Sequence, residues 1–152
     1  MNQSSFATGA DSGPRPRNPR AELLDFMDSL VPWGKLVAGI EPFYPERYRG
    51  RPPAGIETML RMYLLQRWFS FPDEEVEAEI FDSEACRIFM KIDFDTGQLP
   101  AAAVLRRFRR MLEKTKTGKV FFDEISGIFA EKAALMGVKR LINPVLVRIP
   151  GR

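Results

Sequence analysis

Apolar residues recur at intervals of three and four along most of this chain, a spacing that predicts amphipathic helices. Between residues 21 and 40 the pattern is interrupted by Pro32, so it predicts two short helices rather than one. The strongest pattern lies between residues 56 and 71 and predicts the central helix of the core. Its apolar stripe consists of Leu60, Leu64, Trp68 and Phe71.

Further helices are predicted in the second half of the chain. Acidic residues at the start of the segment 73–89 suit a first helical turn, because free backbone N–H groups favour negative charge there, and a bend is expected near Ser83. Pro100 suits the first position of the next helix. Gly118 precedes a last helix that is expected to end near Gly137. The apolar positions of these two helices are Val104, Leu105, Phe108, Met111 and Leu112, and then Phe121, Ile125, Ile128, Phe129 and Leu135.

Length and composition predict one globular domain, since the 152 residues are 45% hydrophobic and 28% charged. We predict an all-α fold, a compact multi-helix bundle formed by residues 21–136. Residues 1–20 have almost nothing to bury, so the entropy of ordering them is uncompensated and they are expected to form a disordered basic arm. Residues 137–152 are expected to form an irregular tail. The proline-rich segment 41–55 predicts a loop.

Composition also excludes several classes of chemistry. The chain contains no histidine, so it lacks the usual general base and the commonest metal ligand. Cys86 is the single cysteine, and therefore neither an intrachain disulfide nor a cysteine-based zinc site can form. No apolar run reaches the roughly 18 residues that span a bilayer, and residues 1–20 lack the apolar centre of a secretory signal. We expect a protein of the cytoplasm with no membrane partner and no cofactor of its own.

Positive charge is concentrated in the helix predicted after Pro100. The net charge of +3 is too small to indicate a nucleic-acid partner, so the placement of the charges matters more. The helix and its end carry six cationic residues against one acid, Glu113, whereas exposed helices normally alternate both signs. These cations are Arg106, Arg107, Arg109, Arg110, Lys114 and Lys116. We predict that they contact the phosphates of double-stranded DNA, with Arg49 and Arg51 of the proline-rich loop as further candidates.

Negative charge is concentrated in a different segment. Residues 73–84 contain seven acids and no base. This run is either the solvated face of a helix or a docking surface for a basic partner, and the sequence leaves both interpretations open.

The order of these segments resembles the N-terminal region of bacterial insertion-sequence transposases of the IS-five group. The resemblance extends from about Leu30 to Met136 and rests on EPFYPERYRGRPPAGIETMLRMYLLQRWFSF, EEVEAEIFDSEACRIFMKID, LPAAAVLRRFRRMLEK and FFDEISGIFAEKAALM. It implies an all-helical region, with the basic helix in a helix-turn-helix-like role, that helps recognise the terminal inverted repeats of the element. It also implies that the full-length family continues into a ribonuclease-H-like domain, whose Asp-Asp-Glu site uses a divalent metal such as Mg²⁺.

Two departures from the family pattern stand out. Ala101, Ala102 and Ala103 occupy positions where the family typically has an acidic residue followed by Ser or Thr, so a polar helix cap worth about 1 kcal/mol is absent. After Met136 the sequence GVKRLINPVLVRIPGR contains neither Asp nor Glu, whereas the family continues into a strand that bears its first catalytic aspartate. We therefore hypothesise a truncated or frameshifted gene product without its own strand-cleaving site.

Two functional classes follow from the sequence. The first is a nucleoid-associated DNA-binding part of a transposase that occupies transposon ends. The second is a helical protein-interaction module, in which the arginines meet an acidic surface of another copy, of a full-length transposase or of a host partner.

Overall fold

The computed structural model describes residues 18–46, 54–95 and 97–136. Within these residues the chain forms helices and no strand, which confirms the predicted all-α fold. The helices are α2 (Pro19–Leu30), α3 (Trp33–Ile40), the 3₁₀ helix η1 (Glu41–Phe43), α4 (Ile56–Phe69), α5 (Val76–Asp82), α6 (Glu84–Met90), α7 (Ala102–Lys114) and α8 (Thr117–Met136).

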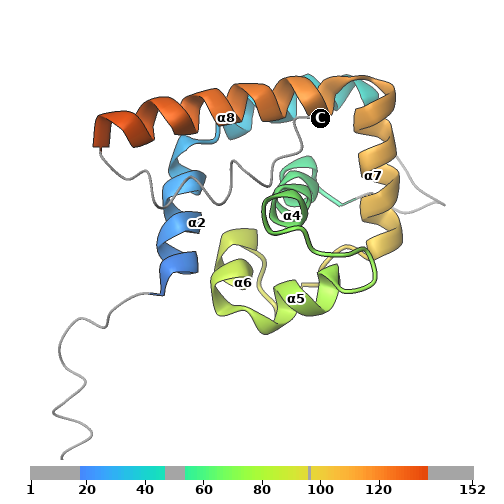
Figure 1. The fold of residues 1–152 in the computed structure, drawn as a ribbon. Helices are drawn as coiled ribbons and strands as arrows, with labels where there is room; N and C mark the ends of the chain where they lie inside the picture. Colours follow the sequence, from blue (N-terminus) through green and yellow to red (C-terminus); the bar gives the residue numbers. More distant parts are fainter. Residues whose placement is uncertain (1–17, 47–53, 96, 137–152) are drawn as a thin grey trace, which may run out of the picture.

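Helix α4 is the centre of the bundle. Figure 1 shows it nearly end on, with α8 above it, α2 and α7 on either side, and α5 and α6 below. The predicted stripe is buried, although α4 ends at Phe69 and Phe71 lies beyond it. Met62 and Leu65 on other faces are buried as well, so α4 is enclosed on nearly all sides. The Trp68 ring of α4 packs between Phe89 and Phe129, at centroid distances of 5.8 and 5.9 Å.

Two helices begin a few residues away from their predicted first residues. Helix α2 begins at Pro19, because the side-chain Oδ1 of Asn18 accepts a hydrogen bond from the Ala21 N–H at 2.8 Å and caps the helix. Arg20, expected in the N-terminal arm, therefore lies on α2, with its guanidinium 4.5 Å from the centroid of the Phe69 ring. The acids from 73 to 75 form a turn, and α5 begins only at Val76.

The bend predicted near Ser83 is a complete break between α5 and α6. The Ser83 backbone is extended, and its Oγ accepts a hydrogen bond from the Cys86 N–H at 3.2 Å, so the residue ends one helix and caps the next. The sequence therefore located the irregularity correctly, but the prediction of one bent helix was wrong, because α5 and α6 are separate helices.

The last two helices begin differently from the prediction. Pro100 lies before α7, whose N-cap is Ala101, and Gly118 lies inside α8 rather than before it. A Cβ atom at Gly118 would stand 3.1 Å from the Tyr63 hydroxyl oxygen, so this glycine allows α8 to approach α4 closely. The turn between α7 and α8 is made instead by Lys116, whose φ of 60° is left-handed.

Some sequence predictions fall outside the described residues. These are the disordered arm over 1–17, the tail over 137–152, and the loop over 47–53 that contains Arg49 and Arg51. In the described part of the chain, no helix has both the length and the apolar character required to cross a bilayer.

Candidate nucleic-acid interface

Helix α7 has one buried face and one cationic face. Leu105, Phe108 and Leu112 are buried, and Val104 and Met111 are half-buried at the edges, which confirms the predicted apolar stripe. Successive residues rotate by about 100° around a helix, so the remaining positions are directed away from the core.

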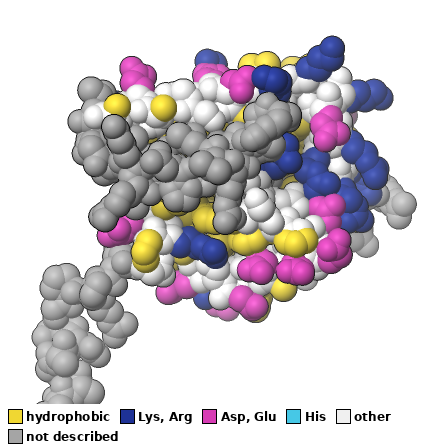
Figure 2. All heavy atoms as spheres, viewed as in Figure 1, with side chains coloured by type: hydrophobic (Ala, Val, Ile, Leu, Met, Phe, Trp, Pro, Cys, Tyr) yellow, Lys and Arg dark blue, Asp and Glu magenta, His cyan; other side chains and the backbone are white. Residues whose placement is uncertain are grey.

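The outward positions of α7 form what we call the cationic ridge, which consists of Arg106, Arg107, Arg110 and Lys114 of the helix together with Lys116 just after it. Arg106 is half-buried and the other four are exposed. Figure 2 shows Lys and Arg side chains gathered on the side of the molecule where α7 lies. Five of the six cations predicted in this segment therefore lie on the outer side of α7 or just after it, and their contact with DNA stays a prediction.

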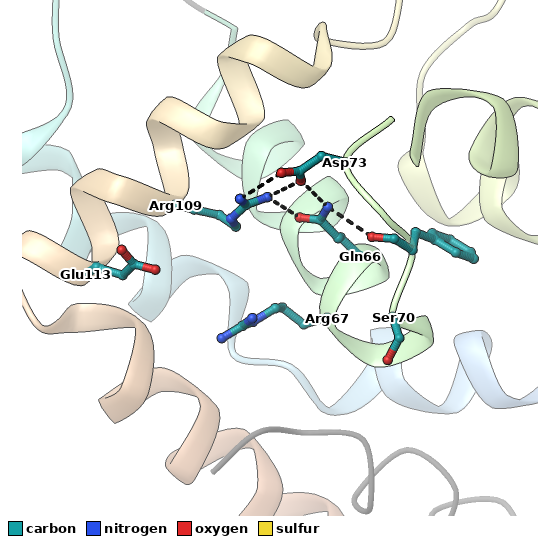
Figure 3. A pocket seen from close by; sticks show the side chains of 7 residues that line it. Gln66, Arg67, Ser70, Asp73, Arg109 and Glu113 are labelled. Carbon is teal, nitrogen blue, oxygen red and sulfur yellow. Dashed lines mark hydrogen bonds and ion pairs between the residues drawn. The ribbon is translucent and has the colours of Figure 1, made fainter. Parts of the chain in front are cut away.

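Arg109 lies apart from this ridge, at the contact of α7 with the end of α4 (Figure 3). Its Nη1 donates to Asp73 Oδ1 at 2.6 Å and to Gln66 Oε1 at 2.8 Å, and its Nη2 donates to Asp73 Oδ2 at 3.2 Å. The Gln66 Nε2 in turn donates to Asp73 Oδ1 at 2.8 Å and to the Phe71 carbonyl oxygen at 3.1 Å. Both terminal nitrogens of Arg109 thus already have protein partners, which a free phosphate contact would have to replace.

This pairing shifts the titration of both partners. Hydrogen bonds from Arg109 and then from Gln66 lower the pKa of Asp73 from its usual 3.8 to about 2, because they stabilise the carboxylate. The hydrogen bond to Asp73 correspondingly raises the pKa of Arg109. The pair is therefore fully charged at neutral pH and connects α7 to the turn that precedes α5.

The pKa of Asp73 predicts an acid-sensitive contribution to stability. A carboxylate with a lowered folded-state pKa stabilises the fold above its usual pKa, and this stabilisation is lost as the pH falls through about 2. Because the side chain is 29% exposed, we discount the effect for screening and expect it to be about 1 kcal/mol. Urea unfolding between about pH 4 and pH 2 should thus show a steeper loss for the wild type than for Asp73→Asn. If the free energy of unfolding falls equally with pH in both proteins, the lowered pKa of Asp73 does not contribute to stability.

A second acid holds α7 at its N-terminus. The Glu77 Oε2, on α5, accepts a hydrogen bond from the Ala102 N–H at 2.8 Å. Ala101 offers no side-chain cap, so the carboxylate of α5 satisfies a free N–H that the local sequence leaves open, in a position that favours negative charge. Two of the seven acids in the acidic run therefore serve the placement of the basic helix.

A cleft of about 520 Å³ opens between the end of α4 and α7 (Figure 3). It is lined by Gln66, Arg67, Ser70, Phe71, Asp73, Arg109 and Glu113. Arg67 was not predicted as a site residue. The sequence pattern indicated that α4 is a core helix, and its few polar residues show no pattern that would mark a binding face. In the described residues, no group of three or more His, Cys, Asp or Glu side chains is arranged to hold a metal ion.

Comparison with known proteins gives the chain a family. No solved structure matches it. A family model described as "Transposase domain (DUF772)" matches residues 14–111, which is more than half of the chain and runs from before α2 through most of α7. The chain therefore belongs to this transposase domain family.

Proposed function

We propose that this chain is the DNA-binding N-terminal part of an insertion-sequence transposase of the IS-five group, and that it recognises the terminal inverted repeats of its element. The observation that carries the proposal is the cationic ridge of α7. The transposase domain match supports a role in transposition, and the ridge supplies a surface suited to a polyanion.

The ridge is available for phosphate contacts because four of its five cations have no salt bridge in the described part of the chain. Among the described residues, Arg106, Arg110, Lys114 and Lys116 form no salt bridge, in contrast to Arg109. Helix α7 is also fixed in place, by Asp73 at its middle and by Glu77 at its N-terminus. A rigid element that presents several cations on one face is suited to follow the backbone of a duplex.

The experiment is a titration of a labelled duplex that carries the terminal repeat, at several salt concentrations. Four phosphate contacts predict that log K falls with log[salt] at a slope of about −3.6. Tighter binding of the repeat than of a scrambled duplex would support recognition, and equal affinities would contradict it. No binding at low salt would overturn the proposal and favour the alternative, a helical module that binds another protein.

In this proposal the chain binds DNA and does not cut it, and the strand-cleaving metal site belongs to a different domain of the full-length transposase. Incubating the purified chain with the repeat duplex and Mg²⁺ tests this part. Nicked or cleaved product, absent from a control without the chain, would overturn it.

A further inference from the structure

Arg67 differs from the other arginines that face the interior of the fold. Arg61 and Arg109 each form a salt bridge with at least one carboxylate. Arg67 is half-buried, yet among the described residues it has no salt bridge, and its Nε atom is buried without a hydrogen-bond partner. A buried guanidinium nitrogen without a partner is costly, so the described part of the fold does not fully satisfy Arg67.

The guanidinium of Arg67 is held in place by aromatic rings. Its Cζ atom lies 5.8 Å from the ring centroid of Tyr63 and 5.7 Å from that of Phe122. Burial raises the pKa of the Tyr63 hydroxyl, and the charge of Arg67 and a hydrogen bond between the two side chains partly offset this shift. The guanidinium is thus preorganised against α4 and α8, which reduces the entropy lost when it binds a ligand.

In the described part of the chain, neither of the two acids that line the cleft pairs with Arg67. In Figure 3 the Arg67 side chain extends from α4 toward α7, where Glu113 lies, and away from Ser70. Asp73 is neutralised by Arg109, and Glu113 is exposed and forms no salt bridge with Arg67. The cleft lies beside the cationic ridge, because Arg109 and Arg110 are consecutive on α7.

We propose that the cleft around Arg67 receives one phosphate of the DNA backbone that lies along the cationic ridge. The Arg67 guanidinium donates to the phosphate oxygens. This inference rests on the proposed function, and it adds to α7 a contact from the core helix α4.

The test compares the salt dependence of duplex binding for the wild type and Arg67→Gln. Loss of one phosphate contact predicts a slope smaller in magnitude by about 0.9, and an affinity about eightfold weaker at about 0.1 M salt. Arg67→Lys retains the charge, so its slope of log K against log[salt] should be close to that of the wild type. Arg87→Gln, which removes a cation from α6, is the matched control and should bind as the wild type does.

Circular dichroism and thermal melting establish that each variant is folded before its affinity is compared. If the wild type binds the duplex and folded Arg67→Gln keeps the same slope, the cleft is not a phosphate site, although the proposed function stands. If the wild type binds no duplex, the proposed function and the DNA contact both fail.

A second measurement does not depend on DNA. Titration of the wild type with inorganic phosphate should shift the ¹⁵N resonance of the Arg67 Nε–H group, identified by its absence in Arg67→Gln. A saturable shift at Arg67 that leaves the Arg87 resonance unchanged supports the site. A titration without any shift at Arg67 overturns it.

Discussion

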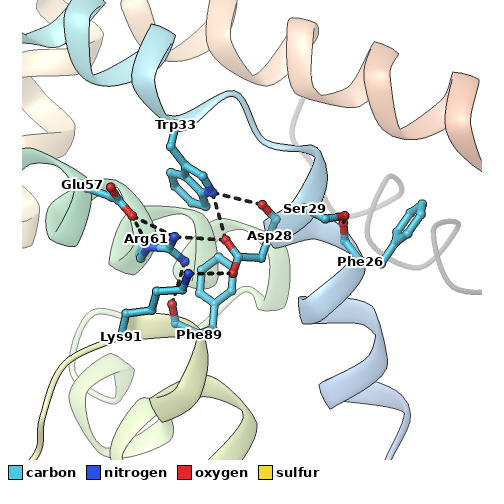
Figure 4. Close-up of polar contacts among 8 residues, drawn as sticks. All are labelled: Phe26, Asp28, Ser29, Trp33, Glu57, Arg61, Phe89 and Lys91. Atoms are coloured by element: carbon cyan, nitrogen blue, oxygen red, sulfur yellow. Dashed lines mark hydrogen bonds and ion pairs between the residues drawn. The ribbon is translucent and has the colours of Figure 1, made fainter.

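Replacing Arg61 with alanine is expected to lower the free energy of unfolding by about 3 kcal/mol. Arg61 lies on the central helix α4 with only 3% of its side chain exposed. Its Nη2 lies 3.0 Å from Asp28 Oδ1 and 2.8 Å from Glu57 Oε2, and its Nη1 donates to the Phe89 carbonyl oxygen at 2.8 Å (Figure 4). The substitution would remove one donor from each of these three acceptors and open a cavity in the core.

The same arginine connects α4 to three other helices. Asp28 belongs to α2 and Phe89 to α6, and the Arg61 guanidinium stacks at 4.0 Å from the ring centroid of Trp33 on α3. The Trp33 Nε1 also donates to Asp28 Oδ1 at 2.9 Å, so the loss of Arg61 disturbs a network rather than one pair.

Urea unfolding of Arg61→Ala and of Arg110→Ala tests this expectation. Arg110 is an exposed arginine in the middle of a helix, so its replacement should change stability by no more than about 0.5 kcal/mol. A double-mutant cycle with Asp28→Ala should give a coupling energy of about 1 to 3 kcal/mol. Equal stabilities of the Arg61 and Arg110 variants would show that the network contributes little.

Local sequence rules predicted the helices because the helical period determines which side chains can share a face. The stripe of α7 separated Leu105 and Phe108 from the arginines beside them, and the structure confirms that separation. The break at Ser83 was predicted only as a bend within one helix, but it too is local, because it depends on the capping of α6 by the Ser83 side chain. These features depend on residues that are close in sequence.

The features that the sequence analysis missed depend on distant residues. Nothing local distinguishes Arg109 from Arg110, and they differ because the turn after α4 places Asp73 beside the first of them. In the sequence, Arg61 is a single polar residue within an apolar helix. Its role becomes clear only from the fold, which places Asp28 of another helix against it. The Glu77 cap of α7 likewise joins residues 25 positions apart.

The largest expected change in DNA binding comes from removing the centre of the cationic ridge. The triple variant Arg106→Gln, Arg110→Gln and Lys114→Gln eliminates three proposed phosphate contacts. The slope of log K against log[salt] should become smaller in magnitude by about 2.7, and the affinity at about 0.1 M salt should fall about 500-fold. Glutamine has a helix propensity close to that of arginine and lysine, so α7 should remain folded.

The control must remove the same number of charges from a different part of the surface. Lys35, Lys91 and Lys132 lie on or next to α3, α6 and α8, and each is exposed. Their replacement by glutamine lowers the net charge equally, so any general effect of charge on DNA affinity appears in this variant as well. If both triple variants lose affinity to the same extent, the protein attracts DNA through its overall charge and α7 is not the interface. A loss confined to the ridge variant is the result expected if α7 is the interface, because α7 presents these three cations on one face and is fixed in place by Asp73 and Glu77.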